Sequence, residues 1–404
     1  MGERGAAGVP QGTVEQGFEG IRDAFATGQA NDDGGAQLCV YRGGKKVVDL
    51  ATGRDIKRDR PYTADLLSVL MSSTKGVVAT AAMMLVERGQ LDPDTPVAKY
   101  WPDFAQNGKA DLRVSQVLAH SAGLAAYPPE VKIGIKELLD WNKPVTALAE
   151  MEPLWRPGTA TAYHALTYGY LVGEIVRRIT GKSVGRFVAD EIAGPLKLDL
   201  WIGLPANEED RVAPQYSTGN EILAEQVEAL LKNFGIDPNA RVVRALLATA
   251  GTAEDTNRFM NSREAHAAEI PAGNGIANAR SLAKMYAATI GEIDGVRLLK
   301  PETVERARRP TNAGLKPPDP LSRLPAHDTH LFGLGYELSR FATPMLGEGS
   351  FGHTGAGGRL GFAHPESGIA VGYICNNMSW DPMSGPDPRW VPWLTALKEI
   401  ASHG

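Results

Sequence analysis

The chain has 404 residues, of which 43% are hydrophobic and 22% charged, and a formal net charge of −5. This length and composition predict a sizeable core in one large or two intertwined domains. The acidic balance and the lack of a basic stripe argue against a nucleic-acid partner, and no apolar run reaches membrane-spanning length, so we expect no membrane partner. The first residues lack the apolar segment of a secretory signal, and two cysteines, Cys39 and Cys375, fit a reducing compartment. We therefore expect a cytoplasmic protein.

The amino-terminal part carries a helical pattern and then a hairpin pattern. Residues 13–28 have apolar positions at helical spacing. Residues 35–42 and 45–51 are strand-like and flank a Gly43-Gly44 turn, which predicts a β-hairpin.

The next stretch, residues 70–76 with the sequence LMSSTKG, opens an apolar run that predicts a helix buried on every side and ended by Gly89. Ser72 and Lys75 stand at i and i+3, so they share one face of its first turn. Burial and the positive end of the helix dipole lower the pKa of such a lysine. A neutral lysine beside a serine hydroxyl forms an activated nucleophile pair. The alternative is that Ser72 only caps the helix and Lys75 reaches water.

Two other serines match nucleophile patterns by chance. Ser281 and Lys284 repeat the Ser-x-x-Lys spacing inside what looks like an ordinary amphipathic helix. The segment GKSVG around Ser183 matches the G-x-S-x-G elbow, which needs a strand before it. A helical pattern precedes it instead, so we interpret Gly181 as a helix C-cap and Ser183 as the N-cap of the next helix.

The remaining pattern places helices in the middle and strands near the end. Helical patterns dominate 96–265, whereas strand patterns return at 333–341, 359–364 and 368–375 and a helical pattern closes the chain at 390–400. We predict an α/β protein with one antiparallel sheet domain built from residues 1–95 and 266–404 and flanked by terminal helices. Residues 96–265 form an inserted, mainly helical domain.

Two further stretches carry candidate chemistry. Tyr163 follows a Pro-Gly turn and acts as a general base if nearby cations lower its pKa, although a tyrosine at a turn is more often a packing residue. Residues 352–358, with the sequence GHTGAGG, let a substrate approach the backbone, and their N–H groups suit an oxyanion hole. The alternative is a glycine-rich hairpin. The eight histidines are scattered and only His327 and His330 form a close pair, in a predicted loop, so we expect no metal and no cofactor.

Taken in order, Ser72-x-x-Lys75, Tyr163 and His353-Thr354-Gly355 resemble the motif set of the serine β-lactamase and penicillin-binding-protein family. The resemblance is closest to the class C group with its family VIII carboxylesterases. It covers most of the chain and extends to residues 91–102, 117–124 and 270–276. It implies a β-lactamase/transpeptidase-like fold with the site between a sheet domain and a helical domain.

The resemblance also implies residue roles. Ser72 would be the nucleophile that forms an acyl-enzyme, Lys75 would share its proton, and Tyr163 would be the base. The N–H groups of Ser72 and Ala356 would form the oxyanion hole. The residues implied to bind substrate are His353, Thr354, Gly355, Trp155 and His164.

Two departures from the β-lactamase pattern favour an ester substrate. Ala165 stands where β-lactamases carry an asparagine that grips the drug, and His353 replaces a lysine and is mostly neutral at pH 7. We therefore predict a serine hydrolase, a carboxylesterase, that cleaves uncharged small-molecule esters without a cofactor. The alternatives are an acyltransferase sharing the acyl-enzyme, a β-lactamase, a D-amino-acid peptidase and a non-catalytic scaffold. The oligomeric state stays open.

Overall fold

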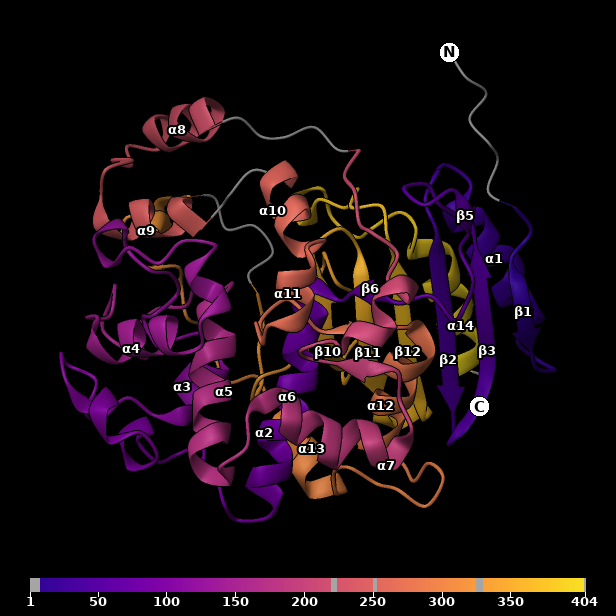
Figure 1. Ribbon diagram of the computed structural model, residues 1–404, viewed down its shortest axis with the longest axis horizontal. Coiled ribbons are helices and arrows are strands. Elements are labelled where there is room, and N and C mark those ends of the chain that lie inside the picture. Colours follow the sequence, from indigo (N-terminus) through magenta and orange to yellow (C-terminus); the bar gives the residue numbers. More distant parts are fainter. Residues whose placement is uncertain (1–7, 219–223, 250–252, 325–329, 403–404) are drawn as a thin grey trace.

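The computed structural model describes residues 8–218, 224–249, 253–324 and 330–402, and shows a strand-rich part beside a helix-rich part (Figure 1). Within these ranges the main sheet has seven strands in the order β1-β3-β2-β12-β11-β10-β9, and every neighbouring pair is antiparallel. The strands are β1 (Gln11–Val14), β2 (Ala36–Arg42), β3 (Lys45–Thr52), β9 (Glu337–Leu338), β10 (Phe351–Gly355), β11 (Arg359–His364) and β12 (Ile369–Cys375). The antiparallel sheet predicted from both chain ends is confirmed.

The amino-terminal hairpin forms as predicted, but the first helix starts later than its pattern suggests. Gly43 and Gly44 join β2 to β3 with φ of 54° and 82°, the left-handed conformation that a two-residue hairpin turn requires. Helix α1 spans Glu19–Gln29. Residues 11–14 pair with the edge of β3 instead of extending the helix, because an open sheet edge offers their backbone groups partners. Likewise, only Glu337–Leu338 of the predicted strand 333–341 joins the sheet.

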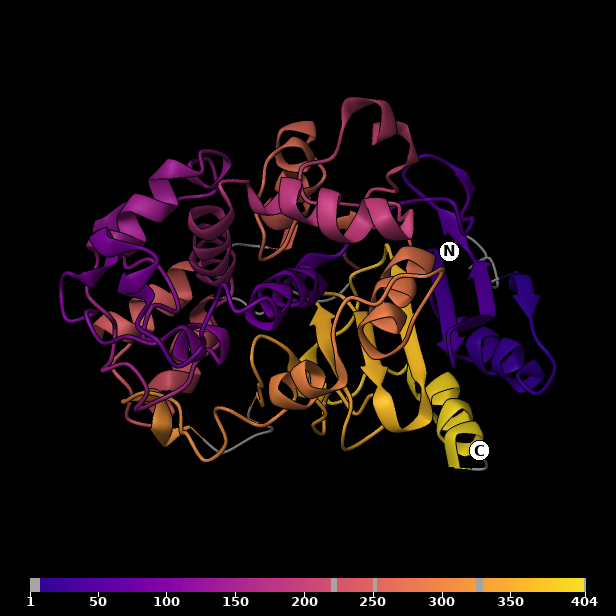
Figure 2. The ribbon, with the colours of Figure 1, turned by 90° about the horizontal axis from the view of Figure 1, so that it is seen from below.

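Helices cover both faces of the sheet. Helices α1 and α14 (Val391–Ser402) lie side by side on one face, visible as the indigo and yellow helices in Figure 2. Helix α12 (Ala279–Ile290) lies on the other face. It approaches closely because Gly361 faces it, and a Cβ there would stand 2.6 Å from the Tyr286 ring. The predicted α/β architecture with terminal helices is therefore observed.

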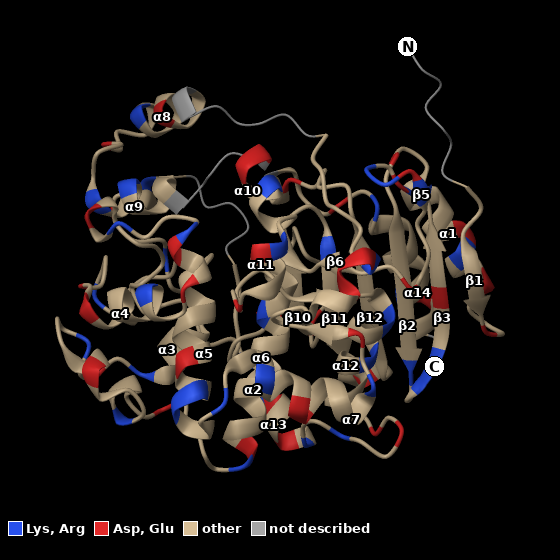
Figure 3. Cartoon of the chain, in the orientation of Figure 1, with Lys and Arg blue, Asp and Glu red and all other residues tan. Residues whose placement is uncertain are grey.

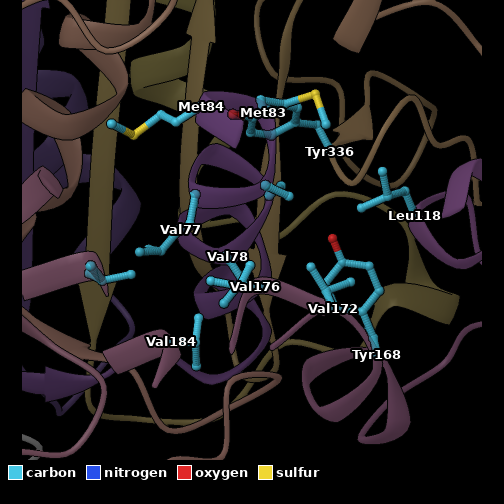
Figure 4. Packing of buried hydrophobic residues seen from close by; sticks show 14 of the residues in the cluster. Val77, Val78, Met83, Met84, Leu118, Tyr168, Val172, Val176, Val184 and Tyr336 are labelled. Atoms are coloured by element: carbon cyan, nitrogen blue, oxygen red, sulfur yellow. The ribbon is translucent and has the colours of Figure 1, made fainter. Parts of the chain in front are cut away.

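Helix α2 (Thr74–Glu87) runs through the centre of the molecule, between β10 and α5 (Thr167–Thr180) (Figure 1). Its residues 74–85 are all buried, so it has no solvent face, as its uniformly apolar sequence predicts. Figure 4 shows Val78 packing close to Val176. Gly89, with φ of 70°, ends the helix and donates its N–H to the Val86 carbonyl. This core holds the first turn of α2 rigidly.

Residues 96–265 are mainly helical, and they connect back to the strand before Ser72. Strand β8 (Ile276–Ala277) pairs with both β6 (Ser68–Val69) and β7 (Leu200–Trp201) in a small sheet. The other short strands are β4 (Arg54–Asp55) and β5 (Arg60–Pro61). The remaining α-helices are α3 (Val114–Leu118), α4 (Asn142–Glu150), α6 (Val184–Val188), α7 (Gly194–Leu196), α8 (Ala224–Asn233), α9 (Arg241–Thr249), α10 (Ala253–Met260), α11 (Arg263–Ala267) and α13 (Pro301–Ala307). The division into two domains stays a prediction.

Acidic and basic side chains are interspersed over both parts of the molecule (Figure 3). In the portion of the chain that the structure describes, no helix combines the length and apolar character that crossing a membrane requires.

Candidate active site

Ser72 lies in a single 3-10 turn, η1 (Met71–Ser73), that directly precedes α2. Two neighbouring segments hold this turn: the Leu70 N–H donates to the carbonyl of Gly275, just before β8, at 2.7 Å, and the Ser73 hydroxyl donates to the carbonyl of His353 in β10 at 3.1 Å. Met71 has a φ of 49°, which a non-glycine residue adopts only when its surroundings impose it. The half-buried Ser72 side chain is thus presented from a fixed backbone.

Lys75 is completely buried, and its Nζ lies 3.2 Å from Ser72 Oγ. The same Nζ is 2.8 Å from the carbonyl oxygens of Ala165 and Ala272. Burial lowers the pKa of Lys75 well below 10.5, and the charge of Glu337 only partly opposes this. In the neutral form, which burial favours, the amine has two N–H groups and one lone pair: with both N–H groups on the two carbonyls, its lone pair would be left for the Ser72 hydroxyl. The predicted depression of the Lys75 pKa is confirmed.

Tyr163 meets this pair from the loop before α5, with its ring centre 4.8 Å from Lys75 Nζ. Its hydroxyl is buried and has no well-aligned hydrogen-bond partner in the described ranges. The nearby Ser72 hydroxyl stabilises the ionised form and so lowers the pKa of Tyr163. Burial dominates and raises the pKa of Tyr163 above its usual value of 10. The condition under which Tyr163 would act as a general base, a pKa lowered by nearby cations, is therefore not met in the free protein, because Arg340 acts in that direction but too weakly. Tyr163 is a neutral phenol in the free protein.

Histidine rings surround Tyr163, which the sequence did not reveal. His120 and His330 lie with ring centres 5.0 and 5.2 Å from the Tyr163 ring, and the His330 ring is nearly parallel to it, at 9°. The only sequence signal for His120 was its place in the family-like segment 117–124, and His330 was expected in a solvated loop. Its partner His327 lies outside the described residues. No group of three or more His, Cys, Asp or Glu side chains that suits a metal ion occurs in the ranges listed above.

His164 and Trp155 support the Tyr163 loop from behind. His164 is fully buried, and both ring nitrogens are used: Nδ1 donates to the Ala162 carbonyl at 2.7 Å and Nε2 accepts the Leu124 N–H at 3.3 Å. Burial lowers its pKa to about 4. Trp155 donates its indole N–H to the Ala160 carbonyl at 3.0 Å. A direct substrate contact, as predicted for His164, does not fit this saturated and buried ring.

Strand β10 brings His353, Thr354 and Gly355 to the other side of Ser72. The His353 Nδ1–H donates to the Thr354 carbonyl at 2.7 Å, and burial lowers the pKa of His353 to about 4, so the ring is neutral at pH 7. The Glu337 carboxylate lies 3.8 Å from His353 Nδ1. Its charge opposes the fall in the His353 pKa but does not overcome burial.

The turn after β10 places Ala356 beside η1. Gly355 permits this, because a Cβ there would stand only 2.3 Å from the Leu70 carbonyl oxygen. Neither the Ser72 N–H nor the Ala356 N–H has an acceptor among the residues described, and Ala356 is exposed. The structure thus brings together the candidate nucleophile, the lysine, the tyrosine and two free N–H donors, which were predicted from three separate stretches.

The alternative serines are engaged elsewhere. Ser183 caps α6, accepting the Arg186 N–H at 3.2 Å and donating to Glu269 Oε1 at 2.6 Å. Gly181 ends α5 with φ of 70°, so the capping interpretation of this segment is confirmed. Ser281 accepts the Asp199 N–H at 2.9 Å within α12.

Comparison with known proteins agrees with this geometry. The family model described as Beta-lactamase matches residues 21–391. "Esterase/beta-lactamase LipL" of Mycobacterium tuberculosis is 37% identical over 355 residues, which cover 85% of this chain and 77% of LipL. A solved family VIII carboxylesterase superposes with a TM-score of 0.79 at 32% identity, covering 96% of this chain and 98% of that one. A penicillin-binding-protein homolog from Caulobacter crescentus gives 0.79 and 32%, covering 96% and 99%. The chain belongs to the β-lactamase family and is a serine hydrolase.

Proposed function

We propose that the protein hydrolyses small-molecule carboxylic esters through an acyl-enzyme on Ser72. One observation carries the proposal. The buried Lys75 Nζ lies 3.2 Å from Ser72 Oγ and 2.8 Å from two backbone carbonyls, so a neutral amine that donates to both carbonyls would direct its lone pair at the serine hydroxyl. This is the arrangement of a general base with its nucleophile.

The geometry supports the following acylation step. Ser72 Oγ attacks the ester carbonyl carbon as its proton passes to Lys75 Nζ, and the carbonyl oxygen becomes an oxyanion held by the N–H groups of Ser72 and Ala356. The intermediate then collapses and the bond to the alcohol oxygen breaks. The leaving alkoxide takes a proton from the neutral Tyr163 phenol, which Lys75 reprotonates.

Deacylation uses the same groups in reverse. A water molecule gives its proton to the neutral Lys75 amine, directly or through Tyr163, as its oxygen attacks the acyl carbon; the bond to Ser72 Oγ then breaks, and Ser72 Oγ takes that proton back from Lys75. Because Lys75 must start as a free amine, kcat/KM falls as the pH drops through its pKa. His353 and His164, with pKa values of about 4, stay neutral above about pH 5 and do not contribute to this fall there.

The substrate we propose is an uncharged ester, and two residues support it. His353 is neutral at pH 7 and offers no fixed cation for a carboxylate. Ala165 has no side-chain amide, and its carbonyl is already bound to Lys75. The printed names of LipL and of the family VIII carboxylesterase point to ester hydrolysis in relatives. We also propose a cytoplasmic location, supported by the two free, buried cysteines, with cell fractionation as the test.

The test is hydrolysis of p-nitrophenyl butyrate by the wild type, Ser72→Ala and the matched control Ser183→Ala. We expect Ser72→Ala to lose at least a thousandfold in kcat and Ser183→Ala to retain full activity. Undiminished turnover by Ser72→Ala would refute the proposal. Adding primary alcohols and measuring transesterified product separates a hydrolase, which forms little of it, from an acyltransferase.

A further inference from the structure

The turn that carries Ala356 is held by its carbonyl groups. The Gly355 carbonyl accepts the Gly358 N–H at 3.0 Å. The Ala356 carbonyl accepts from the Arg359 guanidinium at 2.8 Å, and the Gly358 carbonyl accepts from the Trp390 indole at 2.9 Å. Each of these peptide groups therefore has a fixed orientation.

This arrangement determines where the Ala356 N–H points. In a planar trans peptide the C=O and the N–H point in opposite directions. Because the Gly355 carbonyl is turned inward to Gly358, the N–H of the same peptide, which belongs to Ala356, is turned outward. Arg359 fixes the following peptide plane through the Ala356 carbonyl. The peptide groups before and after Ala356 thus both have fixed orientations. The direction of the Ala356 N–H is set by them, although this N–H makes no hydrogen bond itself.

Arg359 is unusual as a structural clamp, because it is a fully buried cation without an acidic partner. It is 0% exposed, and none of the ion pairs formed by the described residues involves it. Its second terminal nitrogen donates to Gln215 Oε1 at 3.0 Å, and its Nε is buried without a partner. Arg389, which donates to the Gly357 carbonyl of the same turn, is by contrast neutralised by Asp387 and Asp32. Burying a charge without a counterion costs free energy. Because the Arg359 cation lies beside a site where negative charge develops during the reaction, we expect it to serve that reaction.

A second contact extends the clamp to the helical part of the chain. Gln215, which accepts from Arg359, donates its side-chain amide to Asn257 Oδ1 in α10 at 2.9 Å. Both are buried. The Arg359 guanidinium, which extends from β11, is therefore held by the turn that carries Ala356 and, through Gln215, by α10.

We propose that Arg359 is a positioning residue for the oxyanion hole: it holds the Ala356 carbonyl so that the Ala356 N–H points at the oxyanion, and it leaves an uncompensated positive charge behind that turn. This inference rests on the proposed ester hydrolysis. It assigns Arg359 no contact with the substrate, so its effect falls on the transition state and little on ground-state binding.

The experiment compares p-nitrophenyl butyrate with its thionoester analogue, in which sulfur replaces the carbonyl oxygen. Sulfur is a weak hydrogen-bond acceptor, so a well-aimed oxyanion hole prefers the oxygen ester strongly. For Arg359→Met we expect kcat on the oxygen ester to fall about tenfold to a hundredfold, KM to stay within about twofold, and the oxygen-to-sulfur preference to shrink by a similar factor. General damage to the fold would lower kcat equally on both substrates and leave the oxygen-to-sulfur preference unchanged.

Two further variants complete the test. Arg359→Lys keeps the charge, but its single ammonium cannot hold both Ala356 and Gln215, so we expect a partial loss of preference; this variant also decides the matter if Arg359→Met does not fold. A wild-type preference in either folded variant would overturn the inference. If Ser72→Ala is inactive in the same assay, a wild-type preference in the Arg359 variants would refute the role of Arg359 but not the proposed function. An active Ser72→Ala would refute the proposed function itself.

Discussion

The carboxylate of Glu337 binds Thr354 twice, accepting its backbone N–H at 2.9 Å and its hydroxyl at 2.7 Å through the same oxygen. Glu337 is completely buried, and its other oxygen accepts from the Thr343 hydroxyl and the Arg340 guanidinium, both at 3.2 Å. Despite burial, the neighbouring His353 and Arg340 and the bond from Thr354 hold the pKa of Glu337 at about 2. The strand that carries the His-Thr-Gly sequence is therefore anchored by an ionised side chain.

The Glu337→Gln variant tests this anchor through the pH dependence of stability. The folded-state pKa is depressed from 4.5 to about 2, so the stabilisation is fully present above pH 4.5 and disappears as the pH falls through 2. We expect urea unfolding to show the wild type more stable than Glu337→Gln at pH 7 and the gap to narrow between pH 4.5 and 3. A gap that stays constant over this range would contradict the assignment.

The Tyr163→Phe variant separates the hydroxyl of Tyr163 from its ring. The ring contacts with His120 and His330 remain, so the fold and KM should change little. The proton donor for the leaving alcohol is lost, and we expect kcat on an alkyl ester such as ethyl butyrate to fall at least about a hundredfold; p-nitrophenyl butyrate should lose less, because its p-nitrophenolate leaves without a proton. Steady-state kinetics measure this, and a variant with wild-type kcat would show that another group delivers the proton.

The His353→Lys variant tests whether the lack of a cation at this position disfavours carboxylate-bearing substrates. An ammonium at this position adds a fixed cation near Ser72. The Glu337 carboxylate, which lies 3.8 Å from the present ring, would offset part of its charge. We expect kcat/KM for the β-lactam nitrocefin to rise about tenfold while that for the neutral butyrate ester does not rise. The uncharged His353→Gln serves as the matched control, and an equal gain in that variant would argue against a charge effect.

The Ser183→Ala variant should affect stability but leave activity intact. It removes the cap of α6, and with it the bonds to the Arg186 N–H and to Glu269. Loss of such a cap costs about 1 kcal/mol of unfolding free energy. Thermal or urea unfolding should detect this while ester turnover remains at the wild-type level, and reduced turnover in the folded variant would reopen the elbow interpretation.

Local patterns were sufficient to predict most elements that carry the site. The all-round apolar run gave the buried α2, the Gly43-Gly44 turn gave the hairpin, and the positions of Ser72, Lys75 and Tyr163 followed from three ordered motifs. The convergence of these motifs could be stated only through the family resemblance, because their separation along the chain carries no distance information.

What the sequence did not reveal depends on tertiary contacts. The Tyr163 pKa is set by how deeply its hydroxyl is buried, and no local pattern reports this. The Ala272 carbonyl binds Lys75 through the backbone, so residue type gives no signal for it. His164 resembled a substrate ligand until both of its nitrogens were found to be engaged, and β1 depends on a sheet edge formed by residues far along the chain.

The pairing of β2 with β12 joins residues that are synthesised far apart in time. Ala36 pairs with Cys375, so the centre of the sheet stays open until residue 375 has left the ribosome. Ser72 and Lys75 are synthesised well before the strand that presents Ala356 and the strand β12 that supports it. A nascent chain that ends before β12 therefore has no assembled oxyanion hole, so we expect Ser72 to become reactive only after that strand has been made.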